Sequence, residues 1–142
     1  HAVLNANYIR ANLMDTYNVP YPRYCGHEFV LNGKVEGADD IHALDISKRL
    51  IDYGIHPPTI YFPLLVPECF LIEPTETESK QELDRFIDVM QKILVEAQND
   101  PDLLRNAPHT RSIGRLDEVK AARELDLRWR PKTVDSIDPI YS

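Results

Sequence analysis

The chain has 142 residues, of which 43% are apolar and 27% are charged, and its formal net charge is -7. This length suits one domain with a real core, and the acidic balance argues against nucleic acid, whose phosphates need a basic face. No apolar run is long enough to span a bilayer, and no signal-peptide pattern is present. Cys25 and Cys69 lack the spacing of metal ligands, so we expect a reduced, cytoplasmic protein.

The first predicted element is a helix over residues 2–16. Its apolar face is expected to carry Leu4, Tyr8 and Ala11, which recur at helical spacing. The helix is expected to end before Pro20, because the residue before a proline avoids the helical region.

A strand and a second helix follow. Residues 27–31 (HEFVL) alternate polar and apolar side chains and predict a strand, which the turn signal at residues 32–33 (NG) closes. Asp39 or Asp40 is expected to cap the next helix. Gly54 is expected to end that helix in the left-handed conformation.

Two short apolar runs and a long amphipathic helix come next. Residues 59–62 and 69–72 predict strands, and the prolines between them exclude a continuous ladder. The helix has the clearest pattern in the sequence, with apolar residues at i, i+3, i+4 and i+7 from Leu83 to Ala97.

The start of this long helix carries two possible capping boxes. One pairs Thr75 with Glu78, and the other pairs Ser79 with Glu82. Pro101 is expected to stop the helix.

We predict two regions, an α+β domain over residues 1–100 and a helical segment with an extended tail over residues 101–142. Within the second region, a short turn is expected over 102–105 and a helix near 116–124, whereas 126–142 has few apolar residues and needs a partner surface to become ordered. The order of elements predicts an α+β fold, with one layer of helices on a small, mostly antiparallel sheet.

The entry to the second predicted strand is an unusual polar turn. His56, Pro57, Pro58 and Thr59 form a stiff segment, because each proline fixes its own φ and restricts the residue before it. A stiff turn can hold an imidazole and a hydroxyl in place, as a binding site requires. The alternative is that His56 only packs the turn and Thr59 only starts a strand.

Glu73 and His27 are candidates at the same edge of the predicted sheet. Glu73 follows the third strand, so its carboxylate either faces a cleft, a cation or a partner, or stabilises the dipole of the following helix. His27 heads the first strand, where it either joins this edge or has a purely structural role.

The residues by themselves give no complete catalytic apparatus. The sequence has no glycine-rich phosphate loop, no Gly-x-Ser-x-Gly elbow and no zinc-like spacing of His and Cys. None of the six lysines lies in an apolar surrounding, which a Schiff-base lysine requires. We therefore assign no catalytic, cofactor-binding or metal-binding residue.

Several stretches resemble the C-terminal part of glycine dehydrogenase (decarboxylating), the P-protein of the glycine cleavage system, and its two-subunit form in particular. The stretch over 48–74 is the most specific, because its length and proline-rich junctions rarely recur by chance. The stretches are 5–13 (NANYIRANL), 27–31 (HEFVL), 48–74 (KRLIDYGIHPPTIYFPLLVPECFLIEP), 75–86 (TETESKQELDRF) and 115–122 (RLDEVKAA).

The resemblance implies the smaller C-terminal domain of a fold-type I enzyme that depends on pyridoxal phosphate. Such an enzyme decarboxylates glycine and passes the aminomethyl group to the lipoyl arm of the H-protein, with subunit 1 as a partner. The Schiff-base lysine would lie upstream of His1, so the chain alone is expected to bind no cofactor and to be inactive. The residues expected near the entrance for substrate and lipoyl arm are His27, His56, Pro57, Pro58, Thr59 and Glu73.

Two other classes of protein fit part of the pattern. A ferredoxin-like regulatory module that binds an amino acid has a similar order of elements, but it does not explain the long matching stretch. A non-catalytic assembly domain within an inactive subunit is compatible with the lack of catalytic groups.

Overall fold

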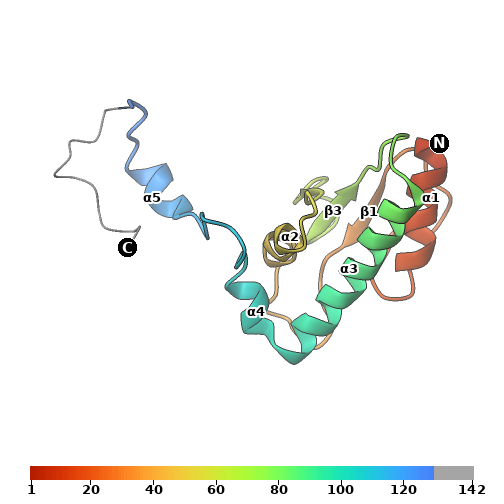
Figure 1. Ribbon diagram of the computed structural model, residues 1–142, viewed down its shortest axis with the longest axis horizontal. Coiled ribbons are helices and arrows are strands. Elements are labelled where there is room, and N and C mark those ends of the chain that lie inside the picture. Colours follow the sequence, from red (N-terminus) through yellow and green to blue (C-terminus); the bar gives the residue numbers. More distant parts are fainter. Residues whose placement is uncertain (130–142) are drawn as a thin grey trace.

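The computed structural model describes residues 1–129 and is an α+β domain from which a C-terminal segment extends (Figure 1). Its elements are α1 (Ala2–Leu13), β1 (Phe29–Asn32), α2 (Ala43–Asp52), β2 (Thr59–Ile60), β3 (Cys69–Ile72), α3 (Lys80–Asn99), α4 (Pro101–Arg105) and α5 (Glu118–Arg123). The predicted α+β class and antiparallel sheet are confirmed. The predicted tail beyond residue 129 lies outside the described residues, and the division at residue 100 stays a prediction.

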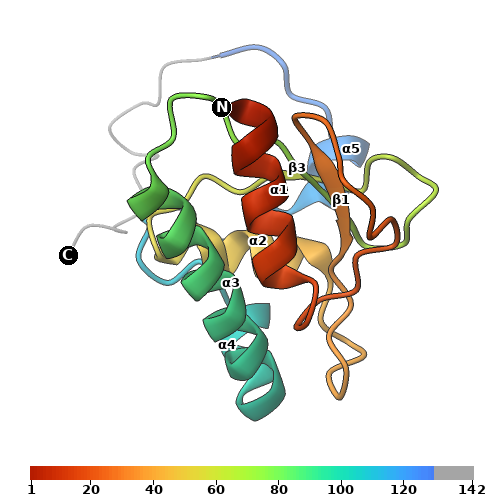
Figure 2. The ribbon, with the colours of Figure 1, turned by 90° about the vertical axis from the view of Figure 1, so that its right-hand side faces the viewer.

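The sheet has three antiparallel strands in the order β1-β3-β2. Phe29 lies opposite Ile72, and Leu31 lies opposite Phe70. Successive side chains of a strand point to opposite faces, so these four apolar residues share one face, and all four are buried. They join the core formed with α1, α2 and α3. Figure 2 shows α1 and α3 side by side, with α2 behind them.

The buried face of α1 differs from the predicted one. Ala6, Ile9 and Leu13 are buried, whereas Leu4 is 69% exposed. The helix also buries polar side chains that the apolar pattern could not reveal, such as Asn5, whose Nδ2 donates to the carbonyl of Thr75 at 2.8 Å. The helix ends at Leu13, three residues earlier than predicted.

Helix α2 is capped by His42 and not by Asp39 or Asp40. The backbone N–H of His42 donates to Asp45 Oδ2 at 2.9 Å, and the N–H of Ala43 donates to Glu68 Oε2 at 2.7 Å. Two carboxylates thus satisfy N–H groups at the start of the helix, where the helix dipole also favours negative charge. The expectation for Asp39 and Asp40 was wrong because the chain is still turning there.

The two proposed caps of α3 have different outcomes. Ser79 Oγ accepts a hydrogen bond from the backbone N–H of Glu82 at 3.2 Å, so the second cap forms. The Thr75 hydroxyl lies 2.8 Å from the Thr77 hydroxyl and does not cap the helix. The chain turns through residues 73–78 before the helix begins, which leaves Thr75 outside it.

β3 spans Cys69–Ile72 as predicted, whereas β1 and β2 differ from their predicted bounds. β1 begins at Phe29, so His27 lies before the strand. β2 ends at Ile60, because Tyr61 has a φ of 60° and turns the chain out of the extended conformation. The predicted turn at 102–105 belongs to the short helix α4, and the predicted helix near 116–124 is α5.

A network of charged side chains joins α2, α3 and the segment after α4. Arg49 Nε donates to Glu96 Oε2 at 2.8 Å, and Arg49 Nη1 donates to Asp52 Oδ2 at 3.1 Å. Asp52 Oδ1 also accepts from the backbone N–H groups of His109 and Thr110 at 2.6 and 2.8 Å. The network therefore fixes the end of α2, from which the predicted polar turn departs.

None of the helices within residues 1–129 combines the length and the apolar character needed to cross a membrane.

Candidate functional site

A cleft with a volume of about 350 Å³ lies between the end of α2, the end of β3 and the start of α3. Four of the predicted site residues line it. They are His56, Pro57, Pro58 and Glu73. The turn at residues 56–58 and the residue after β3 are thus brought to one place.

The turn that carries His56 is held by its neighbours on both sides. Gly54 has a φ of 72°, so the chain leaves α2 in the left-handed conformation, as predicted. Arg85 Nη2 donates to the carbonyl of Tyr53 at 2.6 Å, which ties α3 to the end of α2. After the turn, Thr59 pairs with Leu71 in the sheet.

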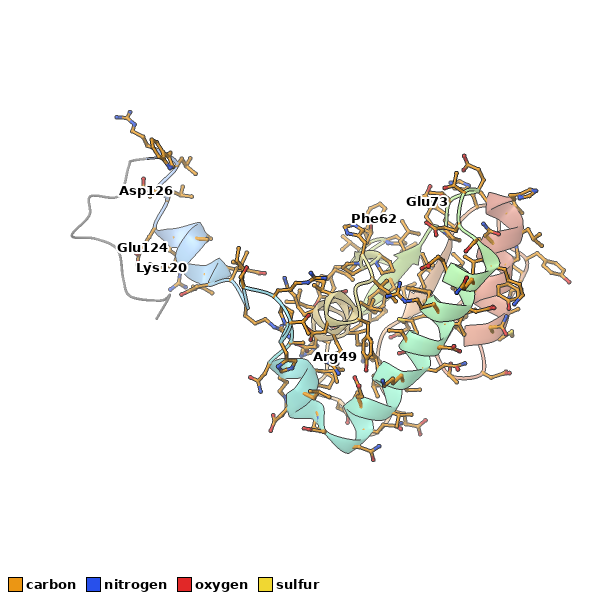
Figure 3. The ribbon with its side chains drawn as sticks, viewed as in Figure 1. Arg49, Phe62, Glu73, Lys120, Glu124 and Asp126 are labelled. Atoms are coloured by element: carbon orange, nitrogen blue, oxygen red, sulfur yellow. The ribbon has the colours of Figure 1, made fainter. Side chains whose placement is uncertain are left out.

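Glu73 follows directly after β3, the central strand of the sheet, near the N-terminus of α1 (Figure 3). The pairing of Phe29 with Ile72 brings the residue pair 27–28 close to it. His27 Nε2 lies 3.7 Å from Glu73 Oε1, and both side chains are largely exposed. This pair is an ion pair only when the histidine is protonated, and its exposure makes it weak.

The geometry distinguishes between the two roles proposed for Glu73, a group that faces the cleft and a group that stabilises the dipole of α3. The first-turn acidic residue of α3 is Glu82, and the helix starts at Lys80, seven residues after Glu73. A dipole effect is confined to the first turn of a helix. The position of Glu73 therefore favours the cleft over the helix dipole.

Two predicted residues do not line the cleft. Thr59 is exposed in β2, and His27 reaches the cleft only through its contact with Glu73.

Sequence reasoning missed the wall of the cleft that α3 and its N-terminal turn provide. Glu78, Glu82, Arg85 and Phe86 line this wall. In the sequence, Glu78 and Glu82 were considered only as partners in the capping boxes, and Arg85 was not singled out. The signal that could have found them is their spacing, because Glu82, Arg85 and Phe86 lie three or four residues apart on one side of the helix.

The cleft combines carboxylates with an apolar floor. Three glutamates and one arginine line it, and Arg85 Nη1 lies 3.3 Å from Glu82 Oε2, so one charge is already paired. Ile72, Leu83 and Phe86 contribute the apolar surface. Such a site can bind a small group with a polar head and an apolar stem.

Covalent attachment of pyridoxal phosphate needs a lysine, and metal binding needs a cluster of ligating side chains. Within residues 1–129 no cluster of three metal-ligating side chains occurs. No lysine lines the cleft. Lys80 at the start of α3 is exposed, and its hydrogen bond to Asp84 raises its pKa, whereas a Schiff-base lysine needs a lowered one. The described residues thus do not fit a covalent site for pyridoxal phosphate.

Comparison with known proteins shows the family. Residues 1–109 match the family described as "Glycine dehydrogenase, C-terminal domain". The chain belongs to this family. The match confirms the resemblance found in the sequence and does not fit a ferredoxin-like regulatory module.

Relatives of this glycine dehydrogenase domain extend the likeness beyond residue 109. The chain is 62% identical over 133 residues to the probable glycine dehydrogenase (decarboxylating) subunit 2 of Coxiella burnetii (strain RSA 493 / Nine Mile phase I), covering 92% of this chain and 27% of the relative. It is 56% identical over 131 residues to the protein of the same name from Exiguobacterium sibiricum, covering 92% and 27%. The protein of that name from Staphylococcus saprophyticus is 58% identical over 128 residues, covering 90% and 26%. The chain thus spans about a quarter of the length of these relatives.

Proposed function

We propose that this chain is the C-terminal part of the second subunit of a glycine-decarboxylating dehydrogenase. In this proposal the cleft helps to form the entrance for glycine and for the lipoyl arm of the H-protein. The observation that carries it is the meeting of the His56 turn with Glu73 in one cleft, within a domain of this family.

The whole enzyme in this proposal uses pyridoxal phosphate and works with a first subunit. When bound, the cofactor supplies an electron sink for the decarboxylation of glycine. We assign its covalent attachment to residues outside 1–129, because no lysine lines the cleft. The aminomethyl group then passes to the lipoyl arm, whose access depends on the shape of the entrance.

The residues of this chain contribute binding and positioning. Pro57 and Pro58 keep the His56 turn stiff, so little conformational entropy is lost when a ligand binds. Phe86 and Ile72 offer apolar contact to the alkyl stem of an arm. Glu73 can accept a hydrogen bond from the polar end of the group that enters.

The test is Glu73→Gln in the full-length enzyme, measured as glycine decarboxylation with H-protein as the acceptor. We expect a fall in kcat/KM of about tenfold, with the melting temperature unchanged, because a contact to the entering group is lost. Glu76→Gln is the matched control, since Glu76 lies only three residues away, is exposed and does not line the cleft. Equal activities of the two variants would contradict the proposed role of the cleft.

A further inference from the structure

Asn5 is a buried polar residue of α1 that does not itself line the cleft. Its exposed fraction is 8%, and its Nδ2 donates to the carbonyl of Thr75 at 2.8 Å. Buried amide groups are paired in folded proteins, because an unpaired one loses its hydrogen bonds to water without compensation. Here the partner is a backbone group 70 positions away in the sequence. Helix α1 thus holds the chain at a point just beyond the sheet.

The segment that Asn5 holds forms one wall of the cleft. It connects β3 to α3, and Glu73 and Thr75 line the cleft from it. Residues 74–78 belong to neither a strand nor a helix. In the part of the chain that the structure describes, the bond from Asn5 is the one hydrogen bond that links these residues to another element. The geometry of the wall therefore depends on it.

The carbonyl of Thr75 is a point from which both ends of the wall are placed. It also accepts from the backbone N–H of Glu78, another residue of the cleft, but at 3.4 Å, so the bond from Asn5 is the better one. In the other direction, only Pro74 separates Thr75 from Glu73. Pro74 is buried and its ring fixes φ, so a movement of the Thr75 backbone is passed on to Glu73.

A second contact from α1 fixes the helix into which the wall leads. The Tyr8 hydroxyl donates to Asp84 Oδ1 at 2.6 Å, near the start of α3. Asn5 and Tyr8 are three positions apart and so lie on one side of α1. Ile9, four positions from Asn5, lines the cleft directly. This side of α1 therefore supports the wall through polar contacts at two places.

We propose that Asn5 is a positioning residue of the cleft, whose hydrogen bond to the carbonyl of Thr75 sets the place of the Glu73 carboxylate. This inference rests on the proposed function, in which Glu73 contacts the group that enters. Asn5 acts through the backbone and does not touch that group. If its amide is removed, water can take over the bond to the carbonyl, because Thr75 is exposed, but water does not fix the carbonyl in one position.

The first test is a double-mutant cycle of Asn5→Ala and Glu73→Gln in the full-length enzyme, measured as glycine decarboxylation with H-protein as the acceptor. We expect Asn5→Ala alone to lower kcat/KM about fivefold, because a displaced group loses much of its effect. In the Glu73→Gln background we expect almost no further loss, because residues that act through one another are not additive.

Tyr17→Phe is the matched control for a purely structural effect. It removes a buried hydrogen bond of the same length, 2.8 Å, from the Tyr17 hydroxyl to the carbonyl of Met90, and neither residue lines the cleft. We expect this variant to keep its kcat/KM. Additive losses in the cycle, or an equal fall of kcat/KM for Tyr17→Phe, would overturn the positioning role. An unchanged kcat/KM for Glu73→Gln alone would instead contradict the proposed function.

The second test does not depend on activity, so it decides the positioning role even if the proposed function fails. Crystal structures of the full-length Asn5→Ala and Tyr17→Phe variants are compared with that of the wild type. We expect the carbonyl of Thr75 and the carboxylate of Glu73 to shift only in Asn5→Ala. Asn5→Leu, which nearly keeps the volume of the side chain, takes its place if that variant does not fold. An unmoved Glu73 in the variant of Asn5 would overturn the inference.

Discussion

Gly54 lies between the end of α2 and the histidine of the cleft, and its φ is 72°. A Cβ atom at this position would meet only Arg85 Nη2, at 3.5 Å, which is an ordinary contact. The requirement for glycine therefore comes from the backbone conformation and not from lack of space.

We predict that Gly54→Ala destabilises the domain by about 1 kcal/mol, because the left-handed conformation is unfavourable for a residue with a Cβ. The free energy of unfolding in urea measures the effect. Gly26→Ala is the control, since Gly26 has open space around it and no positive φ. Equal unfolding free energies of the two variants would contradict the backbone explanation.

Among the elements, α3 is the helix whose N-terminus borders the cleft. Ser79 caps it, whereas Thr75 pairs with Thr77. We predict that Ser79→Ala lowers the free energy of unfolding by about 1 kcal/mol, the usual cost of losing an N-cap.

Thr75→Ala provides the comparison for this cap, because the sequence offered both residues as capping candidates. We expect a smaller loss of stability for Thr75→Ala, measured in the same urea titration. A larger loss for Thr75→Ala than for Ser79→Ala would mean that the capping assignment is reversed.

The success of sequence reasoning differed between elements for physical reasons. α3 was predicted well because its apolar residues fit helical spacing better than any other regular spacing. The buried face of α1 was predicted wrongly, because two sets of residues in this helix have helical spacing. Leu4, Tyr8 and Ala11 were predicted to be buried, whereas the structure buries Ala6, Ile9 and Leu13. The spacing alone does not choose between these two faces.

The cleft was predictable in part. The two polar junctions stood out because prolines beside His56 and after Glu73 have no role in a simple hairpin. The contribution of Arg85 was missed because a charged residue on a helix normally faces solvent. Only the packing of α3 against the end of α2 gives this side chain its place.

At the scale of the whole molecule, the charged network of Arg49, Asp52 and Glu96 links the stability of the domain to pH. Burial by itself would raise the pKa of Glu96, but its hydrogen bonds from Arg49 and Tyr53 outweigh this effect and lower it. The pKa of Asp52 is lowered in the same way, by hydrogen bonds from Thr110, His109 and Arg49 that outweigh burial. Each carboxylate is thus more acidic in the folded state than in the unfolded chain.

The sign of the pH effect follows from these lowered values. A carboxyl group with a lowered folded pKa stabilises the fold above its unfolded pKa, and this stabilisation is lost as the pH falls through the folded pKa. We therefore predict that stability starts to fall below the ordinary Glu pKa of 4.5. Unfolding free energies between pH 7 and pH 3 measure this fall.

Glu96→Gln isolates the contribution of one carboxylate. We expect this variant to be less stable than the wild type at pH 7, with a difference that narrows as the pH falls, because the wild type loses a charge that the variant never had. A difference that stays constant over the whole range would show that Glu96 does not contribute through its ionisation.

The hydrogen bond from Arg85 to the carbonyl of Tyr53 gives one side chain two tasks, since the same guanidinium group borders the cleft. A ligand that binds this guanidinium group would compete with the carbonyl of Tyr53 and weaken the contact between α2 and α3. Conversely, a stronger contact between these helices would make the guanidinium group less available to a ligand. The affinity of the cleft for a ligand and the rigidity of the contact between α2 and α3 are therefore coupled. A substitution at position 85 that raises one of them will lower the other.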